Sequence, residues 1–188
     1  DKGDANVHSN LINKLKDKLE TEHISALIDK GDSSVHSSLI NTLSTDKLEP
    51  HLSTLIDKSD SSVHSILINK LSIDKLEPHL SKLITKGNSS VHSQLIRKLD
   101  GEKINPHFNT LSDKLAPHIT TLIANSDHNN KHKLINEVPD ILKPEHISAL
   151  IDKGDSSVHS SLINKLKDKL APHNINQMID KNKKSHRT

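Results

Sequence analysis

The tripeptide Val-His-Ser recurs along the chain at a constant interval. Its histidines His8, His36, His64 and His92 follow one another every 28 residues, and the tripeptide returns at His159. A fixed period of this size is typical of stacked repeat proteins, in which one short unit is copied along the chain. The fold must therefore be built from a small unit that packs against its own copies.

Residues 48–71 form a complete copy of the unit. Both halves carry apolar residues at the i, i+4, i+7 and i+8 spacing of an amphipathic helix, and the polar residues 58–62 separate them. The apolar positions are Leu48, Leu52, Leu55 and Ile56 in the first half, and Val63, Leu67, Ile68 and Leu71 in the second. The unit is predicted to be a helix-turn-helix hairpin. The fold class is predicted to be all-α, an α-solenoid of stacked hairpins with a period of 28 residues and one irregular joint.

The composition agrees with thin layers. The chain has one Phe and no Trp or Tyr among its 188 residues, so Leu, Ile and Val must form the core. Short apolar side chains suit a core shared between neighbouring repeats.

Local signals mark the turn of each hairpin. Residues suited to end a helix are followed directly by residues suited to cap the next one. These pairs are Gly31-Asp32, Ser59-Asp60, Gly87-Asn88 and Gly154-Asp155. We expect the first helix of each hairpin to end, and the second to begin, at these pairs.

The start of the first helix has its own signals. Asp46 and Asp74 stand three residues before Glu49 and Glu77, the spacing of a capping box. Pro50 and its equivalent Pro78 would then lie in the first helical turn, where a missing N–H costs little.

The period breaks between His92 and His159. We expect regular repeats in residues 1–99, an irregular repeat segment in residues 100–142, regular repeats ending in a half repeat in residues 143–181, and a basic tail in residues 182–188. Within the irregular segment, the helix that opens at Asn105-Pro106 is predicted to run into the next one at Ala116. A degenerate second helix follows, with Lys131 in place of Val. A kink or a change of superhelical path is expected here.

The repeat unit resembles the HEAT repeat. In that family a proline opens the first helix, an aspartate lies at the turn, and a Val-Arg pair opens the second helix. Pro50, Asp57, Asp60 and Val63 match this pattern, and His64 stands where the family has its basic residue. The unit is shorter than most HEAT repeats, and histidine replaces arginine throughout. The resemblance implies an α-solenoid that serves as a scaffold or binding surface.

Histidine is the most abundant candidate for chemistry, with 15 copies. Most lie in two columns, one from Val-His-Ser and one from a Pro-His motif or its variants near the start of each first helix. Neutral imidazole can bind metal or sense pH, but a residue repeated in every layer more often serves the contact between layers. We therefore predict a layer seam in which half-buried histidines bond to an aspartate or serine of their own or the next repeat. The seam residues are His8, His36, His64, His92, His159, His51, His79, His118 and His146. If these side chains are buried and neutral, stability or assembly should weaken below roughly pH 6.

One pair of histidines has metal-ligand spacing. His128 and His132 stand at i and i+4, so they could share a helix face beside Asp127. They are the candidate metal residues, although polar surface residues on a degenerate repeat are the simpler interpretation. No cofactor is expected.

Nothing in the pattern indicates an enzyme. Ser62 and His64 recur in equivalent form in the regular units, whereas a catalytic set would be singular. The chain has no glycine-rich phosphate loop, no H-E-x-x-H motif and no cysteine. It also has no apolar run near the roughly 20 residues that span a membrane, so no membrane partner is expected.

Both ends of the chain fall inside a repeat, and the two partial repeats are complementary. The leading hypothesis is a structural protein that assembles head to tail into a filament, with the chain itself as partner. A heterologous contact that does not close forms such a filament. The residues predicted to make the end-to-end contact are Asp1, Val7, Leu11, Ile12, Ile175, Met178 and Ile179.

Two alternatives remain. The chain could be a protein-binding α-solenoid scaffold excised from a longer array, with another protein as its partner. Nucleic-acid binding is the least favoured, because the net charge is only +2 and phosphate neutralisation supplies most such affinity.

Overall fold

The computed structural model describes residues 2–184, and no β-strand occurs among them. The predicted all-α class is therefore confirmed. The chain divides into two compact units, Asp1–Gln94 and Leu95–Thr188, and the division falls within helix α9.

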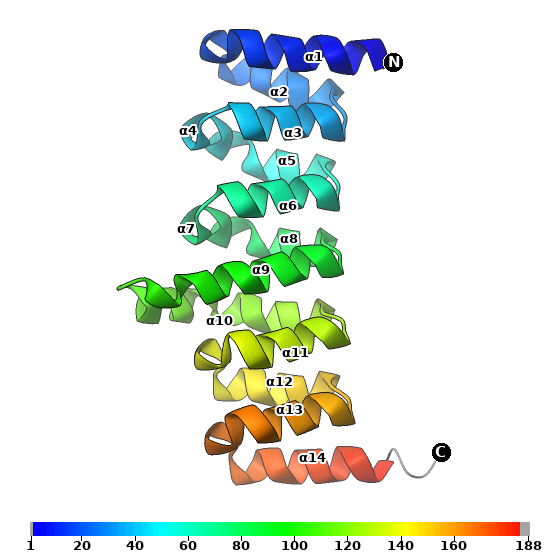
Figure 1. Ribbon diagram of the computed structural model, residues 1–188, viewed down its shortest axis with the longest axis vertical. Helices are drawn as coiled ribbons and strands as arrows, with labels where there is room; N and C mark the ends of the chain where they lie inside the picture. The colour runs from blue at the N-terminus through cyan, green and yellow to red at the C-terminus, as the bar shows by residue number, and fades with distance from the viewer. Residues whose placement is uncertain (1, 185–188) are drawn as a thin grey trace. The chain divides into compact units, whose positions relative to one another are not determined.

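The first unit holds two rows of helices. Helix α3 packs between α1 and α6 in one row, and α5 packs between α2 and α8 in the other (Figure 1). The elements are α1 (Lys2–Leu15), η1 (Lys16–Lys18), α2 (Thr21–Lys30), α3 (Ser33–Thr42), α4 (Thr45–Leu48), η2 (Glu49–His51), α5 (Leu52–Lys58), α6 (Ser61–Lys70), α7 (Ile73–Leu76), η3 (Glu77–His79), α8 (Leu80–Lys86) and the beginning of α9 (Ser89–Gly101).

The second unit repeats this arrangement. Helix α12 packs against α10, α13 and α14, while α11 packs against α13. Its elements after α9 are η4 (Glu102–Ile104), α10 (Phe108–Asn125), α11 (His128–Glu137), η5 (Pro139–Ile141), α12 (Pro144–Lys153), α13 (Ser156–Leu166), η6 (Lys167–Lys169) and α14 (Pro172–Lys184). Of the predicted basic tail, residues 182–184 belong to α14, and residues 185–188 lie outside the described residues.

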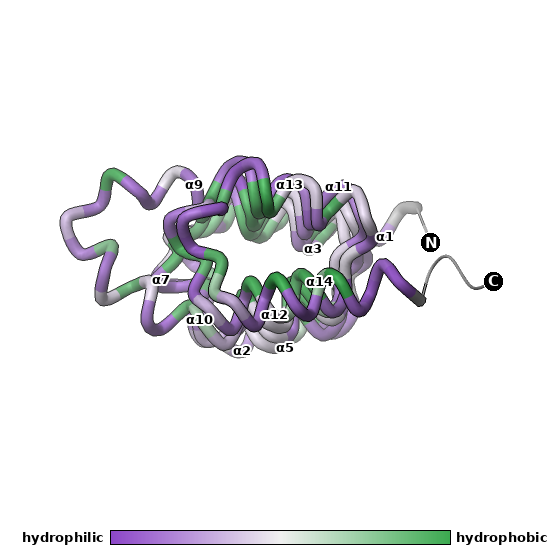
Figure 2. Tube along the Cα trace, turned by 90° about the horizontal axis from the view of Figure 1, so that it is seen from below, coloured by the Kyte–Doolittle hydropathy of each residue, from purple (hydrophilic) through white to green (hydrophobic). Residues whose placement is uncertain are grey.

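The core of each unit lies between its two rows. Apolar stretches of the trace occur on the sides where the rows face each other, and hydrophilic stretches lie outside (Figure 2). In the first unit, Ile24 and Ile28 of α2 are buried together with Val35, Leu39 and Ile40 of α3. Residues four or five positions apart share one face of each helix, which accounts for this burial.

The turns within the hairpins follow the sequence signals. Gly31 ends α2, and Asp32 caps α3 by accepting hydrogen bonds from the backbone N–H groups of Ser34 and Val35 at 3.0 and 3.1 Å. Ser59-Asp60 and Gly154-Asp155 do the same between α5 and α6 and between α12 and α13. Gly31 has φ −82°, and no described residue has a positive φ, so these turns do not use the left-handed cap that glycine often provides.

The prolines of the middle hairpins lie farther from the start of the first helix than predicted. Ser44 caps the first helix by accepting from the Lys47 N–H, so the helix starts at Thr45 and Asp46 is inside it. Pro50 then falls in the 3-10 turn Glu49–His51, between α4 and α5. Proline has no N–H for the α-helical ladder and its ring crowds the preceding turn, which explains the local change of helix type. The capping boxes predicted at Asp46 and Asp74 were wrong, because the N-cap positions are Ser44 and Ser72 and both aspartates lie inside the helices.

Helix α10 joins two predicted helices. It runs from Phe108 to Asn125 without a break and contains Pro117. The predicted fusion at Ala116 is therefore confirmed, while the change of superhelical path stays a prediction.

Candidate functional site

Four histidines of the Val-His-Ser column are buried and close their own hairpins. Each Nε2 lies 2.8–2.9 Å from a carbonyl oxygen in the last turn of the first helix. A carbonyl only accepts, so Nε2 carries the proton and donates. The last carbonyls of a helix lack backbone donors, and the histidine supplies one. The pairs are His36–Ile28, His64–Ile56, His92–Ile84 and His159–Ile151.

The other ring nitrogen points toward the next hairpin. Because Nε2 holds the proton of the neutral ring, Nδ1 of His36 is an acceptor, and the Ser59 hydroxyl donates to it at 2.9 Å. Gly87 stands at the equivalent position after His64, where the Nδ1 atom is buried and has no hydrogen-bond partner among the described residues. Each of these histidines thus makes one constant bond within its own hairpin, and a second bond only where the next hairpin supplies a donor.

The Pro-His column is less uniform. His51 is buried, with Nδ1 3.4 Å from the Ser25 hydroxyl, and burial lowers its pKa. Burial also lowers the pKa of His79, with a smaller contribution from Lys82. His146 is fully buried: its Nδ1 accepts from the Lys143 N–H at 3.0 Å, and its Nε2 donates to the Ala116 carbonyl at 2.8 Å. His118 is half-buried on α10.

Sequence reasoning missed one member of this column. Asn174 is fully buried at the start of α14, and its Oδ1 accepts from the Ala171 N–H at 3.0 Å, as His146 Nδ1 does from Lys143. The neighbouring His173 is exposed. Asn174 precedes Met178 by four residues, as His146 precedes Leu150, so the apolar register could have identified it.

Helix α11 places both candidate metal residues against α13. His128 Nδ1 lies 2.9 Å from Asp155, and the His128 and His132 rings meet edge to face with centroids 4.5 Å apart. Both nitrogens of His132 lie within 3.2 Å of the hydroxyls of Ser157 and Ser161. Within residues 2–184, no group of three or more His, Cys, Asp or Glu side chains could hold a metal ion.

The same helix corrects the position of Lys131. It stands four residues after the cap Asp127, as His159 stands four after Asp155, so it occupies the histidine position rather than that of valine. Asn130, which is 1% exposed, takes the valine position. Lys131 is buried and donates to the Ser126 carbonyl, and burial lowers its pKa.

Lysines link successive hairpins on the outer surface. Some reach back to aspartates of the preceding hairpin, as in Lys58–Asp29 and Lys181–Asp152, both at 2.7 Å. Others donate to carbonyls at the ends of preceding helices: Lys47 to Lys16 and Leu19, Lys70 to Ile40 and Leu43, and Lys169 to Pro139 and Leu142.

The first two helices of the first unit leave an apolar groove. Its volume is about 410 Å³, and we call it the N-terminal face. Its lining residues are His8, Leu11, Leu15, Lys18, Leu19, His23, Ala26, Leu27 and Lys30. Of the predicted contact residues at this end, Val7 is 62% exposed and Leu11 is half-buried, whereas Ile12 is fully buried and offers no surface. Asp1 lies outside the described residues.

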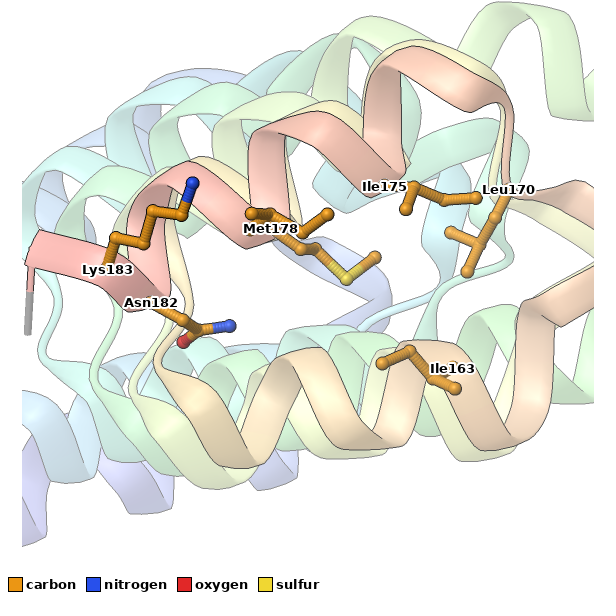
Figure 3. Close-up of a pocket in the computed structure, with 7 residues that line it drawn as sticks. Ile163, Leu170, Ile175, Met178, Asn182 and Lys183 are labelled. Carbon is orange, nitrogen blue, oxygen red and sulfur yellow. The ribbon is translucent and has the colours of Figure 1, made fainter.

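A second apolar groove, of about 460 Å³, lies between α13 and α14 in the second unit. We call it the C-terminal face. Ile163 approaches from α13, and Ile175 and Met178 from α14 (Figure 3). The remaining lining residues are Leu170, Ile179, Asn182 and Lys183. The predicted contact residues Ile175 and Ile179 are half exposed, and Met178 is buried except where it borders the groove.

Comparison with known proteins adds no relative. No family model, curated protein or solved structure matches the chain. No described helix is both long enough and apolar enough to cross a membrane.

Proposed function

We propose that the chain is a non-enzymatic structural α-solenoid, built on a 28-residue hairpin, that assembles head to tail. Two kinds of contact support the repeat arrangement. Side chains bridge positions 27 to 31 residues apart in the first unit, as in Lys58–Asp29 and Ser33–Asp60, and in the second, as in Lys181–Asp152. The bond from a histidine to the carbonyl of the residue eight positions earlier occurs in both units.

One observation carries the assembly proposal. Among the described residues, six large apolar side chains are exposed, and five of them lie on α1, α13 or α14: Val7, Leu15, Ile163, Ile175 and Ile179. Each of the four that line a face is about half exposed. Covering the remaining half of such a side chain contributes about 1 kcal/mol, from roughly 1.5–3 kcal/mol for complete burial. Together the two faces can therefore drive association.

The occupant of each face is a second copy of the chain. Helix α14 corresponds in repeat position to α12, which packs on α13, and α1 corresponds to α13. Among the described residues, neither face has a neighbouring helix beyond it, and the opposite face of a second copy would supply one of matching sequence. Because the two faces differ, the contact is heterologous and can extend into a filament.

Light scattering and negative-stain microscopy of the intact chain at neutral pH test the proposal. Mass should rise with concentration through multiples of 20.8 kDa, and filaments should be visible. A monodisperse monomer at high concentration would refute assembly and favour the scaffold alternative.

Two variants test whether the contact is heterologous. Leu15→Asp disables the N-terminal face and Ile175→Asp the C-terminal face, and each variant alone should be a monomer. Mixed, they should form a dimer and nothing larger, because each keeps one working face. The matched control is Ile104→Asp, at a side chain that is 92% exposed but lies on neither face, and it should still form filaments. Circular dichroism verifies that each variant is folded. A mixture that stays monomeric would contradict a two-faced contact.

A further inference from the structure

The proposed assembly does not by itself determine the register, that is, which residues of the two faces meet. The polar groups on the two faces bear on this question. We infer that α14 of one copy pairs with α1 of the next as α12 pairs with α13 inside the chain. This inference rests on the proposed function. The two helices at the junction then pack like those of a hairpin within the chain, and Ile179 of α14 takes the position that Ile151 of α12 has against α13.

The first support is the match between the helices. Helix α1 carries Val7, His8 and Ser9 at the positions of Val158, His159 and Ser160 on α13. Helix α14 carries Ile175, Met178 and Ile179 at the positions of Ile147, Leu150 and Ile151 on α12.

The second support is a set of donors on the N-terminal face. His8 is half-buried on α1 and lines this face; its partnerless Nδ1 corresponds to the Nδ1 of His64, which faces the next hairpin, so Nε2 is the nitrogen left for the junction. Lys18 and Lys30 also line this face. Neither lysine side chain has a hydrogen bond or ion pair with any residue that the structure describes.

The matching acceptors lie on or beside the C-terminal face, and each pair has an internal precedent. His8 would reach the Ile179 carbonyl as His159 reaches Ile151 at 2.9 Å. That carbonyl lies within α14, but its second lone pair can accept. Lys18 would reach the Leu170 carbonyl as Lys169 reaches Leu142.

The third pair joins two charged side chains. Lys30 of one copy would pair with Asp180 of the preceding copy, as Lys58 pairs with Asp29 at 2.7 Å. Two N-terminal faces brought together would instead set Lys18, Lys30 and His8 against their own copies. Donors would then face donors, which leaves polar groups without partners and like charges close together. The polar pattern therefore selects the head-to-tail contact.

Cysteine cross-linking tests the register, because the chain has no cysteine of its own. The hydroxyls of Ser9 on α1 and Ser38 on α3 lie 3.3 Å apart. In the inferred register, Ser160 on α13 has the same relation to Asn10 on α1 of the next copy. The variant carrying Ser160→Cys and Asn10→Cys should form a ladder of disulfide-linked oligomers under oxidation, and reductant should collapse it.

Two matched variants complete the test. Ser9→Cys with Ser38→Cys should give a cross-linked monomer and no ladder, which verifies the geometry. Ser160→Cys with Asn6→Cys moves the thiol one helical turn along α1 and should give no ladder. Filaments that cross-link through Asn6, or not at all, would overturn the register and leave self-assembly standing. A wild-type chain that never assembles would overturn both.

A charge exchange supplies a second readout. Lys30→Glu alone should raise the concentration needed for assembly by roughly two- to fivefold, the size expected for an exposed ion pair. Adding Asp180→Lys to the same chain should restore assembly, because every junction then holds the reversed pair. Failure of the second change to rescue the first would contradict the pairing.

Discussion

The hydrogen bond between Ser59 and His36 offers a direct measure of what one bond across the seam contributes. Ser59→Ala removes the hydroxyl that donates to His36 Nδ1 at 2.9 Å but keeps the Cβ atom, so no large cavity forms. A neutral hydrogen bond contributes about 1 kcal/mol net, and a buried acceptor left without a donor costs about 1–3 kcal/mol.

The expected loss lies at the lower end of that range. Nδ1 of His64 and of His159 is already buried without a partner, so the fold tolerates this arrangement. We expect Ser59→Ala to lower the free energy of unfolding by about 1–1.5 kcal/mol. For a chain of this length, each kcal/mol corresponds to a fall of about 2–4 °C in Tm.

Urea unfolding followed by circular dichroism measures the effect. Ser34→Ala, at an exposed serine of α3, is the control and should change stability by less than about 0.5 kcal/mol. In a chain that carries His36→Phe, which has no Nδ1 acceptor, Ser59→Ala should cost little. Equal losses for Ser59→Ala with and without His36 would refute the hydrogen bond as the cause.

Three further perturbations test the contacts around the seam. Burial lowers the pKa of His51 and of His79, so below about pH 6.5 the folded chain binds fewer protons than the unfolded chain. The urea concentration at the unfolding midpoint should therefore decrease when the pH is lowered from 7.5 to 5. An unchanged midpoint would contradict the burial of these histidines. Lys70→Met removes donors from two helix-end carbonyls and should cost about 1–2 kcal/mol in urea unfolding, whereas Lys165→Met, at the exposed equivalent position, should have little effect. Asn174→Leu leaves a backbone N–H unpaired and should cost about 1–3 kcal/mol in the same assay, while Asn174→His should be close to neutral because histidine fills this position in α12.

The hairpin ends could be predicted because their causes are local. Asp32 and Asp155 cap helices through N–H groups two and three residues away, and that geometry depends on the short segment alone. Helix periodicity likewise identified the buried apolar residues of the unit at residues 48–71. The start of the first helix was harder, because Ser44 and Asp46 are both suitable caps and only the structure shows that Ser44 accepts the Lys47 N–H.

A bond from each seam histidine to an aspartate or serine of its own or the next repeat was predicted, and the His36–Ser59 contact agrees with it. The particular partner could not be predicted, because it depends on a different hairpin. Nothing near His36 indicates that its Nδ1 has a donor, since that donor is Ser59, 23 residues later. The lysine contacts have the same character: Lys47 reaches carbonyls that are open only because a helix ends beside it.

Packing also decides which apolar residues of the end helices remain uncovered. Leu11 and Ile12 are adjacent on the apolar side of α1, yet Ile12 is fully buried and Leu11 borders the groove. A helical wheel shows an apolar side but not which part of it a neighbour covers. Leu15 and Ile163, which line the two faces, were missed for that reason.

The polar contacts give each regular stretch of repeats a direction. Lys58, Lys70 and Lys181 all donate to acceptors of a preceding hairpin, and Ser59 donates backward to His36. Ser33, which donates forward to Asp60, runs the other way, as does Lys103 in the irregular segment.

This direction has a consequence for any surface that lies between two hairpins. The side toward the N-terminus presents mainly donors, and the side toward the C-terminus presents mainly acceptors. Two like faces therefore cannot satisfy each other's hydrogen-bonding groups, however apolar they are. A buried polar group without a partner costs more free energy than covering half of an isoleucine side chain contributes. In the proposed assembly, unlike faces would satisfy each other in one orientation and one register. The seam that orders hairpins within the chain would then also make the proposed association with another copy directional.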